Sequence, residues 1–231
     1  MEFMADVVFW LADASHWQGP RGVPTRIVEH LAVSAVPLGV AVSAALPLGI
    51  VIGHTGRGAA VAINAANIGR ALPSLAIIVG ILPFALRAGL GLGFWPTVVA
   101  LTVLALPPIV TNTYAGLRGV DREFVDAARG MGMDAWQVIT RVELPLAAPV
   151  VLTGIRIAAV QVVATASLGA VIAGGGLGRF IIDGIARRDH PEVFVGAVLV
   201  VLLSLGTEAT FTAFERLAVS PGLRGITRPV T

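Results

Sequence analysis

The sequence predicts an all-α protein that crosses a lipid bilayer about five times. Apolar side chains make up 56% of its 231 residues and charged side chains only 13%, and the mean hydropathy is +0.86. A soluble domain carries about twice that share of charge, and a disordered chain combines low hydrophobicity with high charge. Both classes are therefore excluded, and the lipid bilayer is the expected surrounding.

Five stretches are long and apolar enough to span a membrane, which takes about 20 residues. Three contain no Asp, Glu or Arg, one is interrupted only by Arg70, and the last is free of charge up to Glu208. In chain order they are 31–53, 59–86, 93–117, 157–178 and 193–217. Prolines inside several of them predict kinked helices, and the pair Gly49 and Gly53 predicts a close helix contact.

The predicted organisation has three parts: an extracytoplasmic or interfacial segment 1–30, a transmembrane domain 31–217 and a cytoplasmic tail 218–231. The first part lacks the basic start and cleavage site of a signal peptide. Its apolar residues favour a short interfacial helix, with Trp10 and Trp17 at the level of the lipid headgroups.

The distribution of arginine predicts which side of the membrane each loop faces. If the segment 118–144 is cytoplasmic, eight arginines lie inside (57, 118, 122, 129, 141, 216, 224 and 228) and six outside (21, 26, 87, 179, 187 and 188). The excess inside places the N-terminus outside and the C-terminus in the cytoplasm.

Several chemistries lack the residues they need. All 16 basic residues are arginine and cysteine is absent, so the chain has no Walker A lysine, Schiff-base lysine or thiolate metal site. His16, His30, His54 and His190 are expected at loop edges, and no His-Glu-x-x-His sequence occurs. We therefore expect no catalytic residue, no metal site and no cofactor in this chain. With so few charges, the basic balance does not indicate a nucleic-acid partner.

The segment 118–144 is the polar exception in an apolar chain, with nine of the 30 charged residues. Its periodicity predicts two short helices, 122–129 and 134–141, broken at Gly130 and Gly132. The adjacent Ala127 and Ala128 would give a flat surface able to enter a groove on a partner protein. The apolar side chains of Met131, Met133 and Trp136 would anchor the contact.

These residues resemble the EAA motif of the permease subunits of ABC importers, spaced as E-A-A-x3-G-x9-I-x-L-P. The match is Asp126-Ala127-Ala128, then Gly132, then Val142-Glu-Leu144-Pro145. Asp replaces Glu at 126 and Val replaces Ile at 142, and both changes conserve the chemistry. Further stretches are similar to the osmoprotectant branch, whose permeases carry glycine betaine, choline or carnitine: 71–76, 111–117, 128–133, 142–146 and 174–178.

The resemblance implies a MetI-like permease fold in a bacterial or archaeal plasma membrane. It also implies three protein partners: an ATP-binding subunit that binds ATP and Mg²⁺, a second permease subunit (identical or paralogous), and an extracytoplasmic solute-binding protein. The residues that would couple to the ATP-binding subunit are Asp126, Ala127, Ala128, Gly130, Gly132, Val142, Leu144 and Pro145.

Aromatic side chains are too few within the spans for a full cation–π cage around a quaternary ammonium group. We therefore expect tight recognition in the binding protein and a weak pathway here, lined by uncharged polar side chains. The pathway candidates are Ser74, Asn112, Tyr114 and Gln161. For each of them, an interhelical hydrogen bond that holds the bundle together is an equally good explanation. An Arg156–Glu208 ion pair is a further expectation, which the sequence alone does not decide.

Two alternatives stay open at this point. One is an ABC permease for another small solute, such as an amino acid. The other is a secondary transporter driven by an ion gradient, which usually shows internal repeats and buried acids.

Overall fold

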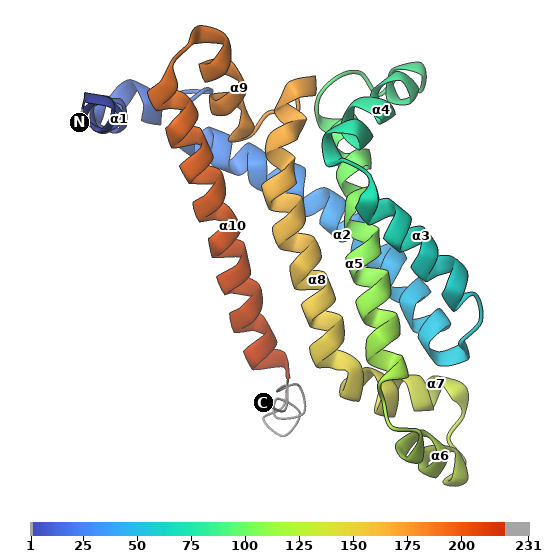
Figure 1. Ribbon diagram of the computed structural model, residues 1–231. Coiled ribbons are helices and arrows are strands. Elements are labelled where there is room, and N and C mark those ends of the chain that lie inside the picture. The colour runs from blue at the N-terminus through green and yellow to red at the C-terminus, as the bar shows by residue number, and fades with distance from the viewer. Residues whose placement is uncertain (1, 220–231) are drawn as a thin grey trace. The chain divides into compact units, whose positions relative to one another are not determined.

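A computed structural model describes residues 2–219, and most of them are helical (Figure 1). The tail predicted for 218–231 lies almost wholly outside the described residues. In chain order the elements are α1 (Glu2–Ala12), a 3₁₀ turn (Ala14–Trp17), α2 (Val23–Thr55), α3 (Ala59–Ala71), α4 (Ser74–Arg87), α5 (Phe94–Arg118), α6 (Arg122–Gly130), α7 (Ala135–Val138), a π-helical turn (Ile139–Glu143), α8 (Leu144–Ala166), a 3₁₀ turn (Ser167–Ile172), α9 (Gly178–Arg187) and α10 (His190–Ala218).

Within residues 2–219, four helical stretches are long and apolar enough to cross a membrane by themselves: Val23–Thr55, Phe94–Arg118, Ala135–Ile172 and His190–Ala218. The predicted all-α membrane fold is therefore confirmed. The expected span 59–86 passes the same test only as a bent pair of helices, α3 and α4, which meet at 100°; counted as one broken span, the pair brings the number to the expected five. Pro73 stands at the break, where its ring disfavours a helical conformation for the residue before it. Counting charges alone did not locate this break.

The expected span 157–178 is also shifted. Its helix begins before Arg156 and runs without a non-helical residue from Ala135 to Ala166. A 3₁₀ turn then ends it, and Ala173 adopts a left-handed conformation with φ of 66°. The prediction began the span after Arg156 because it treated an arginine as a boundary. In the folded chain this arginine has acidic partners on α10.

The described chain divides into two compact units. The first comprises the described residues of Met1–Gly39, Leu72–Leu104 and Ala159–Thr207, and the second those of Val40–Ala71, Ala105–Ala158 and Glu208–Thr231. The long helices contribute residues to both units. We call them the first unit and the second unit and describe each separately.

In the first unit, α1 packs against α2, α9 and α10 instead of standing apart. Val7 and Trp10 join a buried cluster with Val23, Phe180 and Val195. The Trp10 ring contacts Phe180 edge to face, at 5.7 Å between ring centroids. The expected helix in 1–30 is present, and Trp10 packs inside the first unit. Because α2 begins at Val23, the predicted boundary at residue 30 falls inside a helix.

A glycine-rich loop, Gly174–Gly178, is held against the start of α2 in the same unit. Glu29 Oε2 accepts a hydrogen bond from the Gly176 amide at 2.9 Å. His30 is fully buried, and its Nδ1 accepts from the Leu177 amide at 3.2 Å while Nε2 lies 2.8 Å from the Val163 carbonyl oxygen. A carbonyl only accepts, so Nε2 carries the proton. His30 is thus an internal structural residue, and its expected place at a loop edge was wrong.

In the second unit, glycines let helices approach closely. A Cβ on Gly49 would lie 2.6 Å from Thr113 Cβ, and one on Gly53 would lie 2.8 Å from Leu117 Cβ. The close contact predicted for these two glycines is therefore confirmed, between α2 and α5. Gly154 of α8 is equally close to α5, since its Cβ would lie 2.5 Å from Asn112 Cβ.

This packing predicts that Gly154→Ala destabilises the protein. The added methyl group forces α8 away from α5, at a cost of about 1–3 kcal/mol for overpacking. Gly80→Ala in α4 is the matched control, because nothing lies within 4 Å of its added methyl group. The measurement is the midpoint of thermal unfolding in detergent, followed by the loss of the monodisperse gel-filtration peak. Equal midpoints for the two variants would contradict the close packing of Gly154.

Candidate functional site

The segment 121–145 begins with a short helix whose start is fixed locally. Asp121 caps α6, and its Oδ1 accepts a hydrogen bond from the Glu123 amide at 3.0 Å. Glu123 in the first turn and Arg129 in the last turn complement the helix dipole. Figure 1 shows α6 and α7 beside the ends of α5 and α8 to which they are joined. The sequence alone therefore specifies this helix, as predicted for 122–129.

Gly132 ends α6. The Met133 amide donates to the Ala128 carbonyl oxygen at 3.2 Å, and the Gly132 amide donates to the Arg129 carbonyl oxygen at 2.9 Å. These two bonds form a Schellman motif, which needs a left-handed residue after the helix. Gly132 supplies it with φ of 86°, whereas Gly130 is still helical. Of the two predicted helix breakers, only Gly132 acts as one.

The second short helix differs from the prediction of a separate element at 134–141. Asp134 and Gln137 form a capping box at the start of α7, with hydrogen bonds of 2.8 and 3.0 Å. From Ala135 the helix then continues through the π-helical turn into α8. Local sequence marks the start of α7, but its end depends on the chain that follows. The segment is thus one short helix joined to the extended start of a long span.

Two faces of α6 have different surroundings. Arg122, Val125, Asp126 and Arg129, at helical spacing along one face, line a cavity of about 230 Å³ in the second unit. On the opposite side the Phe124 side chain is 58% exposed, and Ala127 is also exposed. Ala128 is 1% exposed, so it packs inward. The predicted flat surface therefore has Ala127 but not Ala128.

Exposed apolar side chains cluster in sequence on this segment. Met131 and Trp136 are each 72% exposed, and Met133 is half-buried. Together with Phe124 and Ala127, Met131 and Trp136 form what we call the α6–α7 surface. Val142 and Leu144 are half-buried, whereas Pro145 is exposed. These three residues belong to the start of the long helix and not to the tip of the loop.

A buried pair that sequence reasoning missed lies at the same cavity. His54 Nδ1, in the last turn of α2, is 2.6 Å from Glu143 Oε2 in the π-helical turn. Only 12% of the histidine side chain and 7% of the glutamate side chain are exposed. The pair ties the end of α2 to the segment that carries α7. Position 143 is the unspecified residue of the Val-x-Leu-Pro stretch, so the motif gave no signal for it.

The predicted pathway residues fall in both units. Ser74 and Gln161 belong to the first unit, and Asn112 and Tyr114 to the second. All four are half-buried. Asn112 Nδ2 donates to the Pro108 carbonyl oxygen of its own helix at 2.8 Å, so this amide has a structural bond. The expected ion pair is present, with Arg156 Nη1 at 3.5 Å from Glu208 Oε1.

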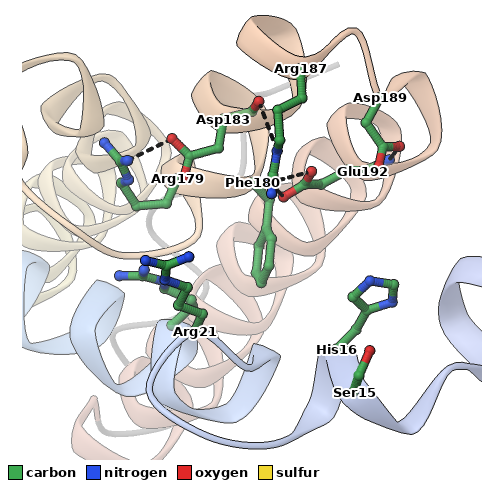
Figure 2. A pocket seen from close by; sticks show the side chains of 10 residues that line it. Ser15, His16, Arg21, Arg179, Phe180, Asp183, Arg187, Asp189 and Glu192 are labelled. Atoms are coloured by element: carbon green, nitrogen blue, oxygen red, sulfur yellow. Dashed lines mark hydrogen bonds and ion pairs between the residues drawn. The ribbon is translucent and has the colours of Figure 1, made fainter.

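A second cavity, of about 220 Å³, lies in the first unit between the N-terminal segment and α9. Figure 2 shows its charges largely paired, Arg179 with Asp183 and Arg187 with Glu192. Among the residues that line it, Phe180 and His16 supply the aromatic rings. These two rings, beside four arginines and three carboxylates, do not form the cage of aromatic faces that recognises a quaternary ammonium cation.

Comparisons with known proteins identify the family of this chain. Residues 45–219 match the family model of the binding-protein-dependent transport system inner membrane component. The glycine betaine/carnitine/choline transport system permease protein OpuCB of Bacillus subtilis is 35% identical over 198 residues, which cover 86% of this chain and 89% of that protein. The carnitine transport permease protein OpuCB of Listeria monocytogenes is 41% identical over 189 residues, which cover 81% of this chain and 84% of that protein.

Solved structures share the fold. A chain of the MetNI methionine ABC transporter in an inward-facing conformation superimposes with a TM-score of 0.77 at 22% identity, covering 86% of this chain and 96% of that chain. A chain of an amino acid ABC transporter gives 0.68 at 18% identity, covering 94% and 98%. At these identities the likeness concerns the fold alone. The family match and the two permease relatives go further: this chain belongs to the family of binding-protein-dependent transport system inner membrane components.

Proposed function

We propose that this chain is the membrane-spanning permease subunit of an ATP-driven ABC importer for osmoprotectants with a quaternary ammonium group. The observation that carries the proposal is the match to permeases of this solute class over more than four fifths of both chains. The choline transport system permease protein OpuBB of Bacillus subtilis, 36% identical over 199 residues, adds a third relative of the class. The chain itself hydrolyses no ATP and holds no cofactor.

The α6–α7 surface is the docking site for the ATP-binding subunit. Its exposed apolar side chains have few contacts within the chain, and Ala127 leaves room between them for a partner. Interfaces of this kind place aromatic and methionine side chains at their centre. Glu143 and Arg129 do not belong to this surface; they line the cavity beneath α6. Asp126, Ala128, Gly130, Gly132, Val142, Leu144 and Pro145 shape and support the surface.

The proposal also includes the orientation of the chain in the membrane and the positions of its protein partners. The α6–α7 surface faces the cytoplasm, which places the C-terminus inside and the N-terminus outside. A second permease subunit, identical or paralogous, packs along α10. Only 17% of the apolar stretch of α10 is buried within the chain, against 61% of that of α5. The solute-binding protein docks at the outer end, where α9 and the glycine-rich loop lie. The solute route through the membrane is lined by uncharged polar side chains: Ser74, Asn112, Tyr114 and Gln161.

The experiment that tests this function is solute uptake into proteoliposomes. The chain is purified with its co-isolated subunits, reconstituted with ATP inside, and supplied outside with its binding protein and radiolabelled glycine betaine, choline or carnitine. ATP-dependent uptake of at least one of these solutes is expected. Uptake driven by an ion gradient without ATP, or ATP-dependent uptake of amino acids alone, would replace the proposal by one of the two alternatives.

The docking role predicts that Ala127→Arg disrupts the complex. A long charged side chain in the middle of an apolar contact leaves a buried charge without a partner, which costs several kcal/mol. Co-purification of the ATP-binding subunit should fall at least tenfold, while the amount of permease in the membrane stays normal. Ala60→Arg is the control, because Ala60 is an exposed alanine in the first turn of α3. Normal co-purification with Ala127→Arg would refute the docking site.

The Schellman motif predicts that alanine substitutions of Gly130 and Gly132 affect the end of α6 differently. Gly132→Ala forces a side chain into the left-handed region, at a cost of about 1–2 kcal/mol, so α6 should unravel at its end. Hydrogen exchange of the α6 amides should then rise about fivefold. Gly130→Ala should leave the exchange unchanged or slower, because nothing lies within 4 Å of its added methyl group. The same rise for both variants would show that helix ending is not what Gly132 provides.

A further inference from the structure

A cluster of charged residues joins α8 to α10 in the second unit. Arg156 Nη1 lies 3.5 Å from Glu208 Oε1 and 3.5 Å from Glu215 Oε2. The same nitrogen donates to Thr212 Oγ1 at 3.1 Å. One guanidinium group is therefore shared by two carboxylates. This arrangement leaves more negative than positive charge in the cluster.

The two carboxylates lie at different depths along α10. This helix has 29 residues, and Glu208 is four residues past its middle residue, 204. At about 1.5 Å per residue, Glu208 is roughly 6 Å from the middle of the helix and Glu215 roughly 16 Å from it. The hydrocarbon core extends about 15 Å to either side of the membrane centre. With α10 centred in the bilayer, Glu208 lies inside the core and Glu215 at its border.

Glu208 is also the most open member of the cluster. Its side chain is 46% exposed, whereas those of Arg156 and Glu215 are each 24% exposed. A carboxylate at this depth does not face lipid, because charged groups within spans turn to the protein interior or to a water-filled cavity. In the complex proposed above, the second permease subunit packs along α10 and the two subunits frame one pathway, so the open side of Glu208 faces that pathway. Phe211, one helical turn further on, shares this side of α10 with Glu208 and is half-buried.

We propose that Glu208 and Phe211 form a cation subsite on the pathway that receives the quaternary ammonium group of the solute. This inference rests on the proposed function, since it assumes a solute of that class. The carboxylate supplies a negative charge and the ring a cation–π face, the two kinds of group that recognise such a cation. Arg156 holds the carboxylate in place and weakens its attraction. A weak site suits a pathway, because a solute must leave each site that it enters.

Three variants test this subsite in the complete complex, reconstituted with its ATP-binding subunit and its solute-binding protein. Glu208→Gln removes the charge at nearly constant volume, and Glu208→Asp retains it. Glu215→Gln is the matched control, because it removes the same charge from the same arginine at the same distance. Gel filtration and ATPase activity verify that each complex is assembled. The measured quantity is ATP-driven uptake of choline, a cation, and of glycine betaine, a zwitterion.

We expect Glu208→Gln to lower choline uptake about tenfold and glycine betaine uptake less, because a net cation depends more on a nearby charge than a zwitterion does. Glu208→Asp should keep most of the uptake, and Glu215→Gln should keep the wild-type ratio of the two solutes. If the wild-type complex carries only one of the two solutes, the test is the uptake of that solute: Glu208→Gln should lose most of it and Glu208→Asp should retain it.

Full uptake by Glu208→Gln, or equal losses for both solutes in Glu208→Gln and Glu215→Gln, would overturn the subsite and leave the cluster as a tie between helices. A wild-type complex without ATP-dependent uptake of either solute would instead overturn the proposed function.

Discussion

The need to satisfy backbone hydrogen bonds without water governs this structure. At membrane depth each amide and carbonyl requires a partner within the chain, and the α-helix provides one for almost every residue. The helix that contains α8 follows this rule. Its hydrogen-bonding pattern changes only next to the two ends of α8, at the π-helical turn and the 3₁₀ turn. The break between α3 and α4 falls at Pro73, which has no amide hydrogen to leave unpaired.

Helix contact in a bilayer depends on close fit, since lipid tails are as apolar as the side chains they would replace. The 27 glycines of the chain serve this fit at particular places. Gly49 and Gly154 bring α2 and α8 against α5 in the second unit, and Gly176 brings the glycine-rich loop against His30 in the first. Other glycines set backbone direction, as Gly132 does at the end of α6.

Some charged side chains connect elements distant in sequence. His54 and Glu143 join the end of α2 to the π-helical turn, and Arg156 joins α8 to α10. Because the helix is unbroken from Ala135 to Ala166, the segment that carries Trp136 continues into the span that contains Arg156. The α6–α7 surface is thus joined to α8 by a continuous helix, and the His54–Glu143 pair ties the same segment to α2.

The sequence by itself determined the membrane class, the helical content, the start of α6 and α7 and the family, because composition, caps and motif spacing are local properties. Tertiary structure decided the rest. It placed Arg156 inside a helix, since its partners Glu208 and Glu215 come from α10, more than 50 residues along the chain. It buried Ala128, Trp10 and His30, and it paired His54 with Glu143, 89 residues apart. Long-range contacts of this kind leave no periodic or local pattern, so only the folded chain reveals them.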